Sequence, residues 1–204
     1  MSTMSRKNYE SAVRQASKAA TSEQLLAVAR PLFAERGYAG VPELEICEAA
    51  GVTRGALQHN FRSKRGLFEA VVAQVQAEIG DHLLDHDVSG LGQVDAFLEV
   101  CREYLRLALR PDIQRIMFVD GPAVLGERLR EIDSSSTIEP LTEAVVELVD
   151  AGLFRPVDAV ATAVMLNGAM IDAAIWSTRH SDPVVAVAAA ADSLEKLIRG
   201  LHAS

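Results

Sequence analysis

The sequence predicts an all-α protein with a small N-terminal helical module and a larger helical domain. Apolar residues recur at helical spacing along the chain, and the period-two alternation typical of strands is absent. The charge is unevenly spread, because residues 1–65 carry a net charge of +4 and residues 66–204 carry −12. Such asymmetry is typical of a nucleic-acid-facing module joined to a domain with another task.

The composition indicates a globular chain. With 204 residues, 49% hydrophobic and 24% charged, it can bury a core without disulfide or metal staples. No apolar run approaches the ~20 residues of a membrane span, and the polar N-terminus lacks the apolar centre of a signal peptide. We therefore expect a cytoplasmic protein with no membrane partner. Cys47 and Cys101 have no metal-ligand spacing, so neither a metal site nor a cofactor is expected.

The first part of the chain predicts a basic arm over residues 1–20 and a short amphipathic helix over residues 23–35. Ser22 is available as its N-cap and Gly37 as its C-cap. Pro31 predicts a kink or a weakened first half of this helix. The arm carries basic residues that could contact phosphates or a minor groove, or could belong to a loosely held tail. They are Arg6, Lys7, Arg14 and Lys18.

Three more helices are expected in close succession. The second covers residues 42–50, with Pro42 at its first position and Gly51 just behind it. Thr53 caps the third helix, RGALQHNF, and Ser63 caps the fourth, KRGLFEAVVAQVQAEIGDHLL.

The larger domain follows a Gly/Asp-rich break at residues 85–92. Its helical patterns cover roughly residues 93–109, 112–120, 123–151, 157–179 and 183–200, with breaks at Pro111, Gly121-Pro122, Gly152 to Pro156, and Ser181 to Pro183. The last two are apolar on more than one face, so they are buried either in one core or against a second subunit. Two consecutive helices of this kind favour a homodimer interface.

Residues 41–61 have the pattern of a helix-turn-helix unit, which lays its second helix in the major groove of DNA. Arg54 can donate two bonds to guanine, and the small residues Gly55 and Ala56 allow close approach. His59 is either a DNA contact or an exposed histidine with no role in binding. The predicted DNA-facing residues are Thr53, Arg54, Gly55, Ala56, Gln58, His59 and, as a phosphate contact, Lys64.

These stretches resemble the TetR family of bacterial transcriptional regulators. The resemblance rests on LFAERGY at 32–38, EICEAAGVTRGALQHNF at 45–61 and SKRGLF at 63–68, and less specifically on FVDGPAVLGERLREID at 118–133 and AGLFRP at 151–156. It implies a DNA-binding domain over residues 21–66 and a ligand-binding and dimerisation domain over residues 67–204. It also implies a homodimer built on the last two helices and double-stranded operator DNA as partner.

The chain departs from the family pattern at three positions. Gln58 replaces a tyrosine that usually touches a phosphate, so a base contact becomes possible there. Val41 replaces a Thr or Ser that would cap the second helix, and Pro31 stands where a helix former is expected. None of these departures breaks the pattern.

The resemblance implies a ligand-responsive regulator, in most members a repressor released from a palindromic operator by a small molecule. We expect that effector to be mostly apolar and not anionic, because the larger domain is acidic outside and apolar inside. The alternative is a helical ligand- or protein-binding dimer without DNA binding. An enzyme is not expected, since no nucleophile elbow, phosphate loop or metal spacing appears.

Candidate pocket residues come from the helices that the resemblance places around a ligand. The apolar ones could equally be plain core, and the polar ones could lie on the surface. For Cys47 and Cys101 the alternatives are a core thiol and a redox switch. The DGP sequence at residues 120–122 is expected to break a helix, with a pocket role as the alternative. The candidates are Phe97, Cys101, Arg102, Tyr104, Met117, Phe118, Met165, Asn167, Met170, Asp172 and Trp176.

Overall fold

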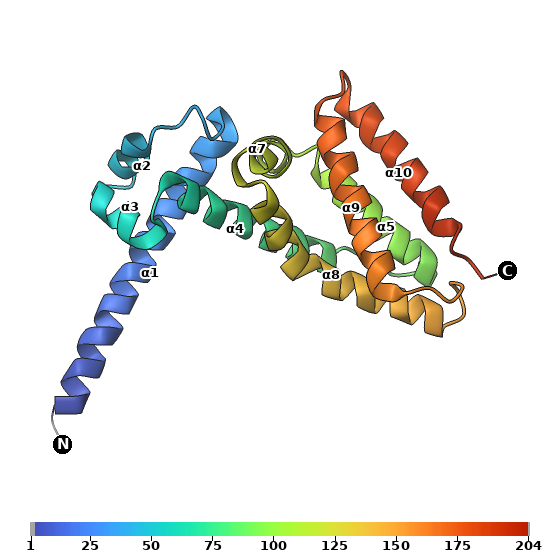
Figure 1. Ribbon diagram of the computed structural model, residues 1–204, viewed down its shortest axis with the longest axis horizontal. Coiled ribbons are helices and arrows are strands. Elements are labelled where there is room, and N and C mark those ends of the chain that lie inside the picture. The colour runs from blue at the N-terminus through green and yellow to red at the C-terminus, as the bar shows by residue number, and fades with distance from the viewer. Residues whose placement is uncertain (1–2, 204) are drawn as a thin grey trace. The chain divides into compact units, whose positions relative to one another are not determined.

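The computed structural model describes residues 3–203, and over this range the protein is helical, apart from an isolated β-bridge between Phe154 and His202. The expected all-α fold is confirmed. The chain divides between Val71 and Val72 into two compact units (Figure 1). Each unit has its own set of buried residues.

The first unit begins with one long helix, α1 (Thr3–Arg36). The expectation that this helix starts at residue 23 is wrong. Ser22 does not cap it, because its hydroxyl donates to Asn60 Oδ1 at 3.0 Å and the chain is already helical. Lys18 lies exposed on this extension, while the side chains of Arg6, Lys7 and Arg14 lie outside the described residues. Pro31 is accommodated inside α1, which continues to Arg36.

Short helices α2 (Glu43–Ala49) and α3 (Arg54–Phe61) follow, and then α4 (Lys64–Leu84) begins. Pro42 precedes α2 as its N-cap residue, one position earlier than expected. The turn between α2 and α3 contains Gly51 at a φ of +63°, which glycine adopts without strain. The predicted caps are confirmed: Thr53 Oγ1 accepts from Ala56 N at 3.2 Å, and Ser63 Oγ accepts from Gly66 N at 3.1 Å.

The core of the first unit is apolar and tightly aromatic. The rings of Phe33 and Phe68 meet edge to face at 5.2 Å between centroids, and Tyr38 lies 5.1 Å from Phe68. Such pairs stabilise a core beyond the area they bury. The fully buried apolar side chains, all at most 1% exposed, are Leu25, Ala29, Phe33, Val41, Ile46, Cys47, Ala50, Leu57, Leu67, Phe68 and Val71.

Lys64 ties the loop after α1 to the start of α4. Its Nζ donates to the backbone carbonyl oxygens of Tyr38 and Val41, at 2.7 Å each, and lies 4.2 Å from the centroid of the Tyr38 ring. Burial lowers the pKa of Lys64, and the nearby charge of Glu43 partly offsets this. The side chain therefore has a structural role in this unit.

The second unit contains the rest of α4 and seven further elements, in which α9 contacts α5, η1, α8 and α10. Gly121 and Pro122 do not break the chain as expected, because both continue a helical path; the break falls at Gly126, whose φ is +59°. The elements are α5 (Gln93–Leu107), α6 (Pro111–Ile113), the π-helix η1 (Gln114–Asp120), α7 (Gly121–Leu125), α8 (Glu127–Asp150), α9 (Ala159–Thr178) and α10 (Pro183–Arg199).

Helix α9 is the one described helix that is long and apolar enough to cross a bilayer by length and composition. Its sequence includes the polar residues Asn167 and Asp172. Asn167 is buried and donates to a carboxylate on α8. The helix thus has one side packed into this unit by polar as well as apolar contacts.

A buried carboxylate, Asp133 on α8, joins three helices of the second unit. Its Oδ1 accepts from Gln76 Nε2 of α4 at 3.0 Å, and its Oδ2 accepts from Asn167 Nδ2 of α9 at 2.6 Å. Gln76 also donates to Thr137 Oγ1 at 3.1 Å. Burial raises the pKa of Asp133, although the donors around it partly counter that rise. Among the described residues, Gln76 Oε1 and Asn167 Oδ1 have no partner.

Replacing Lys64 by methionine keeps the aliphatic stem and removes the two bonds to the loop carbonyls. Because hydrogen bonds to a charged donor contribute about 1.5–3 kcal/mol, the unfolding free energy should fall by about that amount. Urea denaturation followed by circular dichroism measures it. Lys18→Met, on an exposed part of α1, should change stability by less than about 0.5 kcal/mol. Equal midpoints for the two variants would contradict the role of Lys64.

Asp133→Asn should be tolerated, because Gln76 or Asn167 can rotate its amide and accept a bond from the new NH₂ group. An acid whose pKa is raised in the folded state gains stability as pH falls from that raised value towards its ordinary 3.8. As the pH falls from 8 to 4.5, the unfolding free energy of the wild-type protein should therefore rise relative to that of Asp133→Asn.

Urea denaturation measures the unfolding free energy of both proteins at each pH. The contributions of all other carboxylates cancel when one value is subtracted from the other. Asp133→Leu is the contrasting variant. It leaves the buried Asn167 amide without its acceptor and leaves Gln76 only the bond to Thr137, so it should destabilise the protein at every pH. If the difference in unfolding free energy between wild type and Asp133→Asn did not change with pH, burial would not raise the pKa of Asp133.

Candidate nucleic-acid interface and ligand cavity

Helix α3 presents most of the predicted DNA-facing residues to solvent. Its inner side is fixed by the fully buried Leu57 and by Asn60, whose Nδ2 donates to the Ala56 carbonyl at 2.7 Å and whose Oδ1 accepts from Ser22. The opposite side is therefore exposed. The residues exposed there or in the preceding cap are Thr53, Arg54, Gly55, Gln58 and His59, while Ala56 is half-buried.

The fold gives no reason for a glycine at position 55. A Cβ built there would meet a single side-chain atom, Thr53 Oγ1, at 3.6 Å, which is ordinary contact. Gly66 differs, because a Cβ there would lie 2.0 Å from the Phe61 carbonyl oxygen. A glycine inside a helix costs roughly 0.5–1 kcal/mol relative to alanine. The bare surface at Gly55 is thus suited to close approach by a partner outside the chain.

Charge on this unit is arranged differently on α2 and α3. Helix α2 carries Glu43 and Glu45 in its first turn, and Arg36 holds Glu45 through two bonds of 2.5 and 2.7 Å. That pairing lowers the pKa of Glu45 and raises that of Arg36. An anion is disfavoured at the start of α2, whereas the exposed Arg54 stands in the first turn of α3.

Lys64 is placed less freely than the sequence suggests. Two of the three N–H bonds of its ammonium are directed to the carbonyls of Tyr38 and Val41. A phosphate contact by Lys64 would use the remaining donor. The prediction of such a contact stays a prediction, and the same side chain also stabilises the loop.

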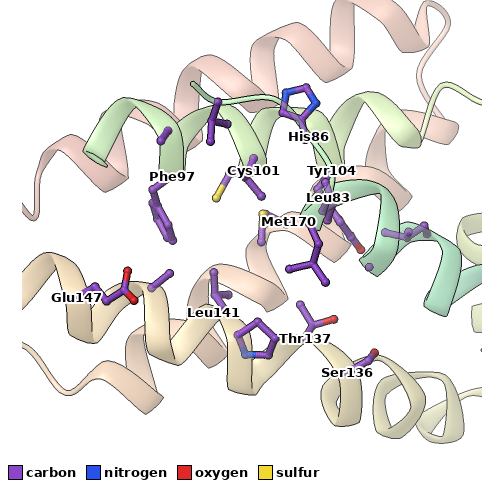
Figure 2. Close-up of a pocket in the computed structure, with 18 of the residues that line it drawn as sticks. Leu83, His86, Phe97, Cys101, Tyr104, Ser136, Thr137, Leu141, Glu147 and Met170 are labelled. Atoms are coloured by element: carbon purple, nitrogen blue, oxygen red, sulfur yellow. The ribbon is translucent and has the colours of Figure 1, made fainter. Parts of the chain in front are cut away.

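The second unit contains a cavity of about 460 Å³. Figure 2 shows Phe97 and Cys101 on α5 across from Thr137 and Leu141 on α8, with Met170 of α9 between them. Helix α4 contributes one further wall through residues such as Gln76 and Ile79. The remaining polar lining is sparse and includes His86, Gln93, Ser136, Thr137, Tyr104 and Glu147.

The predicted pocket residues fall into three groups. Phe97, Cys101, Tyr104 and Met170 line this cavity. Met117, Phe118 and Asp172, together with Tyr104, line a second cavity of about 330 Å³. The remaining four line neither of these two cavities: Arg102 is paired with Glu99 and Glu195, Asn167 belongs to the Asp133 cluster, and Met165 and Trp176 are 74% and 49% exposed.

Sequence reasoning missed Gln76 and Thr137, which line the cavity and also bind one another. Gln76 could have been found, because it lies four residues after Val72 and three before Ile79, on the apolar stripe of α4, where the structure leaves it 3% exposed. Thr137 carries no comparable signal, since the surrounding segment of α8 is polar.

The two cysteines are free and buried. Burial raises the pKa of both thiols, that of Cys101 to about 12. A reactive cysteine needs a lowered pKa and exposure, so these environments favour core thiols over a redox switch. Cys101 lines the cavity, and Figure 2 shows its sulfur on the cavity side of α5.

Two curated relatives share part of the chain. The HTH-type transcriptional regulator AcrR of Shigella flexneri is 28% identical over 139 residues, which are 62% of this chain and 65% of that protein. The HTH-type transcriptional repressor AcnR of Corynebacterium glutamicum is 31% identical over 118 residues, 53% of this chain and 61% of that protein. The chain thus covers less than two thirds of the length of these relatives.

Matches to sequence families and to a solved structure cover more of the chain. Residues 25–71 match the family described as bacterial regulatory proteins, tetR family, and residues 94–201 match the tetracyclin repressor-like C-terminal domain. The crystal structure of a TetR-family transcriptional regulator from Pectobacterium atrosepticum is 35% identical, with a TM-score of 0.82 over 93% of this chain and 97% of that one. The expected resemblance is confirmed, and the chain belongs to the TetR family.

Proposed function

We propose that this protein is a DNA-binding transcriptional regulator of the cytoplasm, a repressor that a small molecule releases from a palindromic operator. The observation that carries the proposal is the exposed first half of α3, where Arg54 stands beside a glycine that the fold does not require. A helix with a bare, basic N-terminal turn matches the way a recognition helix enters the major groove.

Within this proposal the α3 residues divide between reading bases and contacting phosphates. Arg54 donates two bonds to one guanine, and Gly55 and Ala56 allow the backbone to approach a thymine methyl. Gln58 and His59 lie one turn further along the exposed side and reach a base or a phosphate. Thr53 remains the cap of the helix and offers its hydroxyl side to the DNA backbone.

Operator binding by a homodimer follows from the outer faces of α9 and α10. Seven large apolar side chains on these helices are at least 49% exposed, which is more than a monomer needs to leave in water. A second copy would cover them and would present two recognition helices to half-sites about 34–36 Å apart or a multiple of it. They are Val160, Val164, Met165, Trp176, Val184, Val185 and Leu197.

The 460 Å³ cavity is the proposed effector site, since its size is typical of small-molecule pockets, which are roughly 300–1,000 Å³. Its apolar walls suit a mostly apolar molecule, and the unpartnered Gln76 Oε1 suits a ligand group that donates a hydrogen bond. A neutral or cationic effector fits this lining better than an anion, because Glu147 also lines the cavity.

Gly55→Ala tests the close approach of α3 to DNA. The substitution should raise stability by about 0.5–1 kcal/mol, because alanine is the better helix former, yet it should weaken binding at least tenfold. The probe is a fluorescent duplex selected from a random pool by the wild-type protein, measured by anisotropy.

Gly80→Ala is the matched control for this variant. It makes the same change in α4, where a Cβ meets no atom within 4 Å because Gly80 lines the 460 Å³ cavity, so the comparison is made without any added compound. It should leave DNA binding unchanged. Wild-type affinity in Gly55→Ala, or failure of the pool to yield any enriched duplex, would contradict the proposed interface and favour a ligand-binding dimer that does not bind DNA.

Arg54→Ala tests base reading. Its loss should cost about 1–3 kcal/mol of affinity and relax the preference at one base pair in each half-site. Repeating the selection with the variant measures that preference directly. A uniform loss of affinity with an unchanged selected sequence would assign Arg54 to a phosphate instead.

Met165→Glu combined with Leu197→Glu tests the dimer. Two buried carboxylates without partners would oppose association, so sedimentation should show a shift from dimer to monomer at micromolar concentration. Leu91→Glu, an exposed leucine in the segment before α5, is the control and should leave the dimer intact. A monomeric wild-type protein would contradict the interface.

A further inference from the structure

Two histidines and a glutamate converge where α4 ends. His82 lies in the last turn of α4, and His86 follows two residues after the helix ends at Leu84, where its N–H donates to the Leu83 carbonyl at 3.4 Å. His82 Nε2 lies 2.8 Å from Glu103 Oε1 of α5, and one ring nitrogen of each histidine and a Glu103 oxygen all lie within 4.8 Å of one another. The rings of His82 and His86 are 6.3 Å apart between centroids.

The surrounding charges hold the glutamate in place as an anion. Arg106 Nη1 donates to Glu103 Oε2 at 3.1 Å and to Glu99 Oε1 at 2.7 Å, which leaves Glu103 Oε1 facing His82. Burial raises the pKa of Glu103, but the bonds from His82 and Arg106 outweigh it and lower the pKa overall. Glu99 Oε1 also lies 3.8 Å from His86 Nε2, so a second carboxylate stands beside the histidine pair.

We propose that His82, His86 and Glu103 bind a divalent transition metal ion of the Zn²⁺ class. Imidazole nitrogens and a carboxylate oxygen are the donors such ions take, with bonds of about 2.0–2.2 Å and a fourth position left for water or another ligand. Tetrahedral bonds of that length put donor atoms about 3.3 Å apart, so the imidazoles have to close in slightly. His86 lies beyond the last residue of α4 and can supply that adjustment.

The competing interpretation is two ordinary ion pairs, His82 with Glu103 at 2.8 Å and His86 with Glu99 at the longer distance of 3.8 Å. Two separate pairs do not require a ring nitrogen of His86 to lie within 4.8 Å of both His82 and the Glu103 carboxylate, whereas a shared metal ion does. A metal ion at this site would also affect the 460 Å³ cavity, because His86 lines that cavity (Figure 2). A bound ion would clamp the end of α4 to α5 at the wall of that cavity. This site goes beyond the proposed function and does not depend on DNA binding.

The test is titration of the full untagged chain, freed of metal with a chelator, using Co²⁺ and Zn²⁺. Co²⁺ should give the visible absorption of a four-coordinate site at one ion per chain, and Zn²⁺ should displace it. Zn²⁺ should also raise the melting temperature of the protein, because it binds the folded state. Calorimetry gives the Zn²⁺ affinity.

His82→Ala, His86→Ala and Glu103→Gln should each weaken Zn²⁺ binding at least tenfold and abolish the Co²⁺ absorption. His180→Ala is the matched control, since His180 is exposed in the turn before α10, and it should bind Zn²⁺ as wild type does. Circular dichroism verifies that each variant is folded, and the isosteric Glu103→Gln guards against unfolding of the alanine variants. Absence of stoichiometric binding, or binding that survives all three substitutions, would leave the ion pair alone and overturn the proposal.

Discussion

The buried carboxylate of Asp133 is the interaction on which the second unit depends. It accepts from amides of α4 and α9 and belongs to α8, so one carboxyl group joins three helices that are distant in sequence. Burying an ionised carboxylate is costly unless donors surround it. Gln76 and Thr137, which belong to this cluster, also line the 460 Å³ cavity. A molecule in the cavity that binds Gln76 Oε1 therefore changes the surroundings of Asp133.

Helix α4 contains both Gln76, which binds Asp133, and Lys64, which holds the loop of the first unit. Lys64 holds the loop carbonyls at its start, and Gln76 binds Asp133 twelve residues later. An effector can alter DNA binding through such a helix if it binds one of two states better than the other. The magnitude of the response is then set by that difference in affinity.

Local signals predicted the short helices and the caps of the first unit well. Thr53 and Ser63 cap their helices as expected because a cap is decided by neighbours three residues away. The start of α1 was missed, since the capping residue Ser22 has a more distant partner in Asn60. The break at Gly121-Pro122 was wrong for a similar reason: proline is tolerated in the first turn of a helix, and here the π-helix η1 runs directly into α7.

The cavity was harder to predict because its walls come from helices far apart in sequence. Periodicity tells that Phe97 and Met170 face inward, but it does not distinguish a cavity wall from packed core. Periodicity also does not tell which apolar face of a helix stays exposed. Met165 and Trp176 are therefore among the predicted pocket residues, although they are 74% and 49% exposed. The cluster of His82, His86 and Glu103 is equally hard to predict from the sequence, because the histidines and the glutamate come together only when the end of α4 packs against α5.

The central claim is that one chain couples a molecule in the cavity to operator DNA, and reciprocal titration tests it most directly. Ala144 lines the cavity, so Ala144→Phe should fill it. A compound that raises the melting temperature of wild type but not of this variant is titrated calorimetrically with and without the selected duplex. The duplex should lower the affinity of the protein for the compound by the same factor by which the compound lowers its affinity for the duplex. Equal compound affinities in the two titrations would contradict it.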